Sequence, residues 1–189
     1  MSVNGGAGLK SILLTGGARS GKSRLAQELA LKSGGRVLFV ATAEAGDDEM
    51  KRRIKAHRKL RPSGWVTLEV TNHVGSHITK NIGRAGTVII DCVTLLVNNI
   101  FQQFDENADA SRLEKAVVAE IKELCDCIDR SDADFIIVTN EVGLGIIPGD
   151  RVSRLYRDLL GKANQMLAEH VDEVYLMVAG LPVTVKKRT

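Results

Sequence analysis

Ser11 to Ser23 reads SILLTGGARSGKS, a short apolar run followed directly by a glycine-rich loop. The loop, Gly16 to Ser23, matches the pattern G-x-x-x-x-G-K-[ST], which binds nucleotide phosphates when it lies between a strand and a helix. Glycines let backbone N–H groups turn inward around a phosphate, and the dipole of the following helix adds to the attraction. Lys22 supplies a positive charge for the β- and γ-phosphates, and Ser23 supplies a hydroxyl ligand for Mg²⁺. The stretch therefore predicts a nucleotide site at the end of a strand.

Apolar runs alternate with amphipathic stretches along the rest of the chain. The runs are nearly continuous in hydrophobicity, as expected for parallel strands covered on both faces. They are Ser11–Thr15, Arg36–Thr42, Thr87–Cys92 and Phe135–Asn140, with a weaker one at Val66–Val70. Helical patterns occupy Gly21–Ser33, Asp47–Arg61, Ala110–Asp129 and Asp150–His170. We therefore predict one doubly wound α/β domain over residues 11–189, preceded by a flexible segment over residues 1–10.

The end of the chain carries a hairpin pattern. Two runs of strand type, Glu173–Ala179 and Val183–Lys187, flank Gly180-Leu181-Pro182. Glycine and proline between two such runs favour a tight turn. The last strand is therefore predicted to be antiparallel.

The composition is typical of a globular protein, with 189 residues, a net charge of +3 and 44% hydrophobic residues. No apolar stretch approaches the ~20 residues of a spanning helix, and the first residues form no apolar signal segment, so we expect a cytoplasmic protein. Cys92, Cys125 and Cys127 cannot form a fully paired disulfide framework, and no second ligand pair completes a zinc site. The small charge excess and 4% aromatic residues favour the absence of a nucleic-acid partner.

Asp91 ends the apolar run Val88-Ile89-Ile90-Asp91. A carboxylate at the C-terminal edge of a core strand lies where P-loop proteins hold Mg²⁺. The alternative is that Asp91 caps a following helix. Small GTP switches are excluded, because residues 91–94 read DCVT in place of D-x-x-G and residues 139–142 read TNEV in place of [NT]-K-x-D.

The predicted helix Asp47–Arg61 begins with acidic residues and is mostly basic in its second half, in agreement with the helix dipole. A solvated face is the ordinary explanation for such a basic run. His57 shares one face with Met50 and Ile54, however, so it does not lie simply on the solvated side. Two interpretations stay open from the residues alone: a core histidine, which is favoured, or an imidazole facing the nucleotide with Arg58 beside it.

Segments over nearly the whole chain resemble one enzyme family. They are GGARSGKS (16–23), ATAEAGDDEM (41–50), RIKAHRKLRP (53–62), GWVTLE (64–69), IIDCVTLLVNN (89–99), VTNEVGLGIIP (138–148) and RLYRDLLGKANQMLAEHVDEVYLMVAGLPV (154–183). In this order they resemble the bifunctional adenosylcobinamide kinase / adenosylcobinamide-phosphate guanylyltransferases of cobalamin biosynthesis. The resemblance implies a P-loop NTPase-like (RecA-like) α/β fold of three layers, with a mainly parallel sheet and an antiparallel C-terminal hairpin.

The resemblance also implies two reactions at one P-loop site. A nucleoside triphosphate, ATP or GTP, first phosphorylates adenosylcobinamide with the help of Mg²⁺. His57 falls on the family's guanylylated histidine, which attacks the α-phosphate of GTP and expels pyrophosphate. The resulting GMP–histidine passes its GMP to adenosylcobinamide phosphate and yields adenosylcobinamide-GDP. This resemblance, and not the spacing, reverses the preference for a core histidine.

The family's nucleotide contacts map onto four groups of residues. They are Gly16, Gly17, Ala18, Arg19, Ser20, Gly21, Lys22 and Ser23; Ala41, Thr42 and Ala43; Arg58, Lys59, Leu60 and Arg61; and Glu69 with Asp91. His57 and Lys22 are expected to be catalytic, and Ser23 and Asp91 to bind Mg²⁺. The other histidines, His73, His77 and His170, fall on no catalytic position of the family.

The resemblance also implies an oligomeric state, whereas the role of Glu141 stays open. Members of the family form homo-oligomers, which implies a trimer here, with the corrinoid near a subunit boundary. Glu141 follows a core strand, and both a substrate or Mg²⁺ role and a loop-ordering role stay open for it.

Two other hypotheses stand beside the bifunctional enzyme. A P-loop small-molecule kinase without nucleotidyl transfer needs no nucleophilic histidine, so the role of His57 separates the two enzymes. An ATP-binding module that acts on nucleic acid draws on the basic run at residues 51–61, but the scarcity of aromatic residues opposes it. For such a module, affinity for single strands falls steeply with salt.

Overall fold

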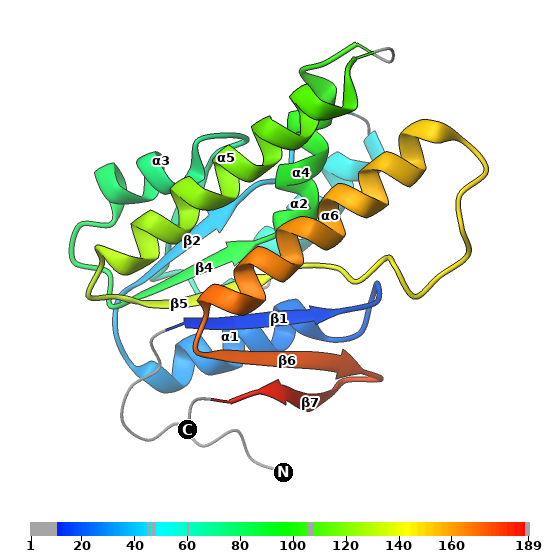
Figure 1. The fold of residues 1–189 in the computed structure, drawn as a ribbon. Coiled ribbons are helices and arrows are strands. Elements are labelled where there is room, and N and C mark those ends of the chain that lie inside the picture. The colour runs from blue at the N-terminus through cyan, green and yellow to red at the C-terminus, as the bar shows by residue number, and fades with distance from the viewer. Residues whose placement is uncertain (1–10, 45, 47, 60, 106–107, 188–189) are drawn as a thin grey trace.

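Seven strands form one sheet through the middle of the protein, in the order β3-β2-β4-β5-β1-β6-β7 (Figure 1). All neighbouring pairs are parallel except β6 and β7, which pair antiparallel. The strands are β1 (Ser11–Gly16), β2 (Val37–Ala41), β3 (Val66–Glu69), β4 (Thr87–Asp91), β5 (Asp134–Val138), β6 (Glu173–Val178) and β7 (Leu181–Lys186). The predicted α/β class, the mainly parallel sheet and the antiparallel hairpin are confirmed.

This computed structural model describes residues 11–44, 46, 48–59, 61–105 and 108–187. For residues 50, 53, 56 and 57 it describes the backbone alone. The segment 1–10, which we expect to be flexible, lies outside the described residues.

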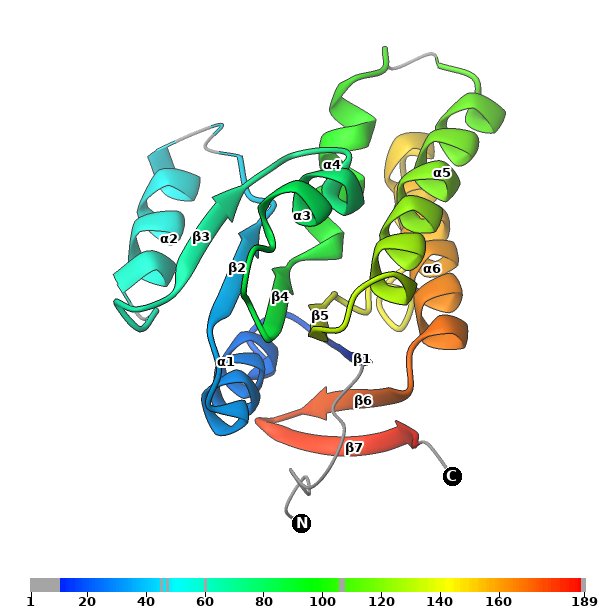
Figure 2. The same cartoon turned by 90° about the vertical axis from the view of Figure 1, so that its left-hand side faces the viewer.

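Helices cover both faces of the sheet. They are α1 (Lys22–Ser33), α2 (Asp48–Lys59), α3 (Val74–Asn81), α4 (Val93–Gln102), α5 (Ala110–Asp129) and α6 (Arg151–His170). Helices α3 to α6 pack on one face, α1 packs on the other, and α2 lies beyond the edge strand β3 (Figure 2). In the part of the chain that the structure describes, no helix is both long enough and apolar enough to cross a membrane.

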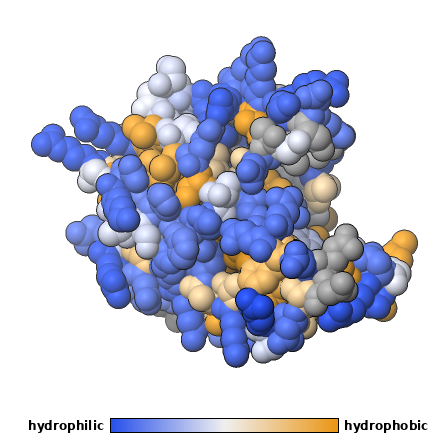
Figure 3. All heavy atoms as spheres, turned by 90° about the horizontal axis from the view of Figure 1, so that it is seen from above, coloured by the Kyte–Doolittle hydropathy of each residue, from blue (hydrophilic) through white to orange (hydrophobic). Residues whose placement is uncertain are grey.

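Each face of the sheet has its own apolar core. The larger core includes Leu13, Val40 and Ile90 from the strands, together with apolar residues of α3 to α6. The smaller core includes Phe39 and Ile136 and is covered by α1. The outer surface seen from above the larger layer is mostly hydrophilic (Figure 3). This two-sided burial explains why the strand sequences are apolar along their whole length.

The helices α3 and α4 were not predicted. Helix α4, VTLLVNNIFQ, is buried at Val93, Leu96, Val97 and Ile100, among others, and follows the apolar strand β4 after a single residue, so the sequence shows one nearly continuous apolar segment there. Helix α3 is only eight residues long. The other predicted helices and strands are present, with ends that differ by one or two residues.

The turn of the C-terminal hairpin begins one residue earlier in the sequence than predicted. Val178 pairs with Leu181, so Ala179 and Gly180 alone form the turn. Both have positive φ, 49° and 85°, as the favoured two-residue hairpin turn requires. Pro182, predicted within the turn, lies in β7, which is an edge strand and therefore tolerates a residue without an N–H donor.

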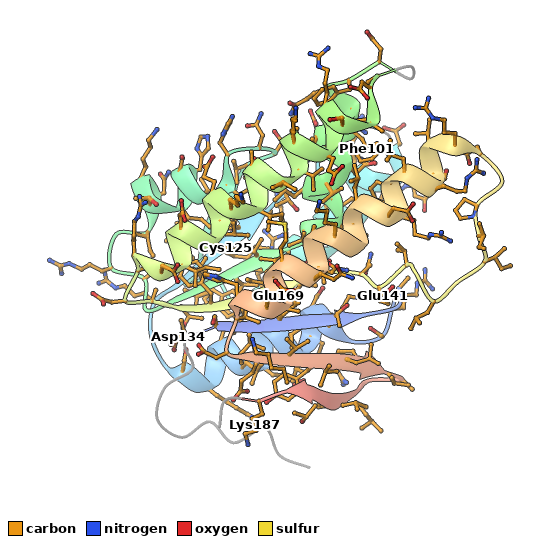
Figure 4. The ribbon with its side chains drawn as sticks, in the orientation of Figure 1. Phe101, Cys125, Asp134, Glu141, Glu169 and Lys187 are labelled. Atoms are coloured by element: carbon orange, nitrogen blue, oxygen red, sulfur yellow. The ribbon has the colours of Figure 1, made fainter. Side chains whose placement is uncertain are left out.

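A lysine from β7 caps the C-terminal end of helix α6. Lys186 Nζ donates to the carbonyl oxygens of Ala168, Glu169 and Val171 at 2.9, 2.9 and 2.6 Å. These are carbonyls that the helix cannot satisfy itself. We expect Lys186→Met to lower the free energy of unfolding by about 1–3 kcal/mol in urea titrations. Lys187→Met is the matched control, because Lys187 is exposed (Figure 4), and an equal loss there would contradict the capping role.

Candidate nucleotide site

The predicted phosphate loop connects β1 to α1. Gly16 and Gly21 have φ values of +142° and +97°, a conformation that side chains other than glycine rarely adopt. A Cβ atom at Gly16 would also lie only 2.6 Å from the carbonyl oxygen of Met177 in β6. The turn of the C-terminal hairpin supports the loop from behind, because Gly180 N–H donates to Ser20 O at 3.0 Å. These contacts hold the loop in a fixed curve at the start of helix α1.

Lys22 is only 6% exposed and bends back over the loop. Its Nζ donates to Gly16 O at 2.9 Å and Gly17 O at 2.6 Å, and lies 3.4 Å from Ser20 Oγ. Burial lowers the pKa of Lys22, while the negative charge of Asp91 acts in the opposite direction. Among the described residues, Lys22 Nζ contacts carbonyl and hydroxyl oxygens and no carboxylate, which favours the approach of a phosphate.

Three predicted residues meet in one row at the C-terminal edge of the sheet. Ala41 lies opposite Glu69 in the β2–β3 ladder and opposite Asp91 in the β2–β4 ladder. Because neighbouring strands are about 4.8 Å apart, the two carboxylate residues are separated by about 10 Å. The N-cap position of α4 is occupied by Cys92, so the capping alternative considered for Asp91 is wrong.

Arginines from the end of α2 and the turn after it reach this row. Arg58 forms an ion pair with Glu69. The Arg61 guanidinium lies 3.8 Å from the centre of the Phe39 ring, and its buried Nε atom has no hydrogen-bond partner among the described residues. Burial lowers the pKa of Arg61, and the charge of Asp91 opposes that shift. The half-buried Arg61 guanidinium is suited to an anion such as a phosphate.

His57 lies on helix α2, one residue before Arg58. Its side chain, like the whole of Leu60, lies outside the described residues, and Lys59 is exposed. Two hollows border this helix. One is lined by Arg58, Arg61, Trp65 and Thr67, among others. The other is lined by Ile54, Arg58, Asn72 and His77, among others, and the predicted position Ala43 also borders it. The Arg58–Glu69 pair borders both hollows, so His57 lies on a helix that is open on two sides.

Thr42 follows β2 and is fully buried. Its hydroxyl donates to Cys92 O at 2.7 Å, and its N–H donates to Asp91 O at 3.3 Å. Both donors of Thr42 are therefore used inside the fold. Among the three predicted positions at 41–43, Ala43 is the more exposed one.

Glu141 lies beside the phosphate loop (Figure 4), and its N–H donates to Gly16 O at 3.0 Å. Its carboxylate accepts a bond of 2.5 Å from Gly143 N–H. The loop-ordering role that stayed open for Glu141 thus has a direct basis in these contacts.

The other three histidines have contacts of different kinds. His73 Nδ1 lies 3.0 Å from Glu123 Oε2, and this hydrogen bond raises the pKa of His73. His170 Nε2 lies 3.1 Å from Asp129 Oδ1 at the far end of α6. His77 is exposed and borders the second hollow beside α2. The first two are structural pairs, whereas His77 lies nearer to the site than the sequence indicated.

The protein groups suited to Mg²⁺ are few. Within the described residues, no group of three or more His, Cys, Asp or Glu side chains could hold a metal ion. Ser23 at the start of α1 and Asp91 at the end of β4 are the two predicted ligands. One hydroxyl and one carboxylate fit an ion that takes its other ligands from phosphate oxygens and water, as Mg²⁺ does.

Comparisons with known proteins agree with the resemblance. A family model described as cobinamide kinase / cobinamide phosphate guanyltransferase matches residues 12–185. The chain is 41% identical over 180 residues to the bifunctional adenosylcobalamin biosynthesis protein CobU of Escherichia coli strain K12, covering 93% of this chain and 99% of that protein. It is 40% identical over 180 residues to CobU of Salmonella typhimurium strain LT2, with the same coverage. It is 40% identical over 174 residues to the bifunctional protein CobP of Pseudomonas aeruginosa strain PAO1, covering 92% and 96%.

Proposed function

The chain belongs to the cobinamide kinase / cobinamide phosphate guanyltransferase family, and we propose that both reactions use the C-terminal edge of its sheet. The phosphate loop acts on the triphosphate, and helix α2 carries the nucleophile for the second reaction. The observation that carries this proposal is the row formed by Glu69, Ala41 and Asp91, which lies between the P-loop side of the sheet and α2.

In the first reaction, the hydroxyl oxygen of cobinamide attacks the γ-phosphorus of ATP or GTP. The bond from that phosphorus to the bridging oxygen breaks, the nucleoside diphosphate leaves, and the hydroxyl proton passes to solvent. Lys22 turns from the carbonyls of Gly16 and Gly17 to the phosphate oxygens and balances the charge of the transferring group. Ser23 and Asp91 would hold Mg²⁺, which would supply further positive charge to the phosphates.

In the second reaction, a ring nitrogen of His57 attacks the α-phosphorus of GTP. Pyrophosphate leaves, and a phosphorus–nitrogen bond joins GMP to the protein. A phosphate oxygen of cobinamide phosphate then attacks the same phosphorus, the phosphorus–nitrogen bond breaks, and the product is cobinamide-GDP with free imidazole. The covalent intermediate divides one displacement between two anions into two steps. Arg58 and Arg61 neutralise phosphate charge beside the histidine.

The protein is also proposed to form a homo-oligomer, with a trimer implied by the family. Several of the exposed large apolar side chains gather in two groups, Leu144, Ile146 and Ile147 before α6, and Leu181, Val183 and Val185 on β7. Exposed apolar patches of this kind favour association between subunits. Light scattering on the purified protein tests the proposal, and a monomer at micromolar concentration would contradict it.

A two-product assay tests the proposed function as a whole. The purified chain, given adenosylcobinamide, GTP and Mg²⁺, is expected to form adenosylcobinamide phosphate first and adenosylcobinamide-GDP later. Mass spectrometry measures both products over time. Accumulation of the phosphate without any GDP product would leave only a kinase. Formation of neither product from the folded protein would contradict both activities.

A further inference from the structure

Asn99, a residue of helix α4 that no step of the mechanism uses, lies buried behind the site with 5% of its surface exposed. Both protons of its Nδ2 group have acceptors, because Nδ2 lies 2.8 Å from Thr42 O and 3.2 Å from Thr71 O. Thr42 is the first residue after β2, and Thr71 is the second residue after β3. One amide therefore joins the backbone beyond two neighbouring strands.

The connection continues to the next strand. Cys92, directly after β4, donates its N–H to Thr42 Oγ1 at 2.8 Å, and its carbonyl accepts from the same hydroxyl at 2.7 Å. On the other side, Val70 N–H donates to Ala41 O at 3.0 Å. Asn99 thus links the ends of β2 and β3, and the Thr42 hydroxyl continues the hydrogen-bonded chain to the end of β4.

The ends of β4 and β3 do not depend on the Asn99 hydrogen bonds to the same extent. Strand β4 lies inside the sheet, with β2 on one side and β5 on the other, so its end is held by two ladders. Strand β3 is the edge strand and is held by β2 alone. Loss of the Asn99 bonds therefore loosens the end of β3 more than the end of β4, because edge segments with fewer bonds open at lower free energy.

The end of β3 in turn holds helix α2. Glu69, two residues before Thr71, pairs with Arg58, and Thr67 lies 3.5 Å from Arg61 Nη1. These contacts join β3 to the end of the helix that carries His57. A shift of the β3 end is passed to α2, whereas the phosphate loop is held separately by β1, β6 and the hairpin turn.

We propose that Asn99 is a positioning residue for guanylyl transfer, which acts by fixing the end of β3 and through it the place of His57. The inference rests on the proposed role of His57. A displacement of about 1 Å in a reacting group can cost about 10²-fold in rate, so even a small movement of α2 is measurable. The kinase step, which uses Lys22, the loop and Asp91 at the end of β4, is expected to change little, because β4 is held by strands on both sides.

Asn99→Asp is the sharpest variant, because it keeps the shape of the side chain and turns the donor into an acceptor that faces two carbonyl oxygens. Asn98→Asp is the matched control, since Asn98 is the neighbouring residue of the same helix and is half-buried. We expect Asn99→Asp to slow GMP–protein formation from GTP in a single turnover by about 30- to 100-fold. Phosphorylation of cobinamide by ATP stays within about threefold, and the control changes neither rate.

The ratio of the two rates separates positioning from a merely structural role. An equal fall of both rates, or no fall of GMP–protein formation, would overturn the proposal. Should Asn99→Asp fail to fold by circular dichroism, Asn99→Ser, which keeps one donor, replaces it with the same expected direction of the ratio. If the unaltered protein forms no GMP adduct, the role of His57 fails and this inference falls with it, which distinguishes the two failures.

Discussion

Lys22→Met is expected to lower the rate constant for phosphorylation of cobinamide by at least about 10³-fold. Lys22 supplies a positive charge inside the phosphate loop, where it is only 6% exposed and the low dielectric strengthens its effect on the transferring phosphoryl group. Methionine preserves the length of the side chain and removes the charge. The measurement is the initial rate with saturating ATP and Mg²⁺.

The control for this change lies on the same helix. Lys32 is exposed in the last turn of α1, so Lys32→Met removes an equal charge far from the loop and is expected to leave the rate unchanged. Thermal denaturation of both variants separates loss of chemistry from loss of folding. A Lys22→Met protein that keeps a tenth or more of the activity would contradict the proposed role of the lysine.

His57→Asn is expected to abolish guanylyl transfer, with a fall of at least about 10³-fold, because asparagine has no nucleophilic ring nitrogen and the covalent path is lost. Phosphorylation of cobinamide continues, so adenosylcobinamide phosphate accumulates. Product analysis by mass spectrometry at fixed times follows both compounds. His77→Asn is the matched control, since His77 borders the neighbouring hollow and is proposed to have no chemical role. If His77→Asn, and not His57→Asn, stops the second reaction, the assignment of the nucleophile is wrong.

The fold could be predicted from the sequence where its signals are local. The phosphate loop is such a case, because one contiguous motif determines both the turn and the start of α1. The central strands β2, β4 and β5 are another, since each is a nearly continuous apolar run. Helix α4 was not predicted because it follows β4 after a single residue and is mostly apolar, so its sequence continues the apolar run of that strand. The order of the strands depends on packing between distant segments and is not contained in any one of them.

The site residues, too, include some that could be predicted from the local sequence and some that could not. Asp91 could be located at the end of a strand, but its place beside Ala41 and near Glu69 follows only from the ladders of β2. Asn99 carries no signal at all in the sequence, because a polar residue in an apolar helix acquires its role only when two backbone carbonyls reach it. His57 was favoured as a core residue by its spacing, and only the family resemblance assigned it to the chemistry.

The central claim is that one chain transfers both a phosphoryl group and, through His57, a guanylyl group. The most direct test is incubation of the protein with Mg²⁺ and GTP labelled at the α-phosphate, followed by denaturing gel electrophoresis and mass mapping of the labelled peptide. We expect an acid-labile, alkali-stable GMP adduct on His57 that is released by cobinamide phosphate and is missing in His57→Asn. A label on another residue, or no label on protein that still phosphorylates cobinamide, would contradict it.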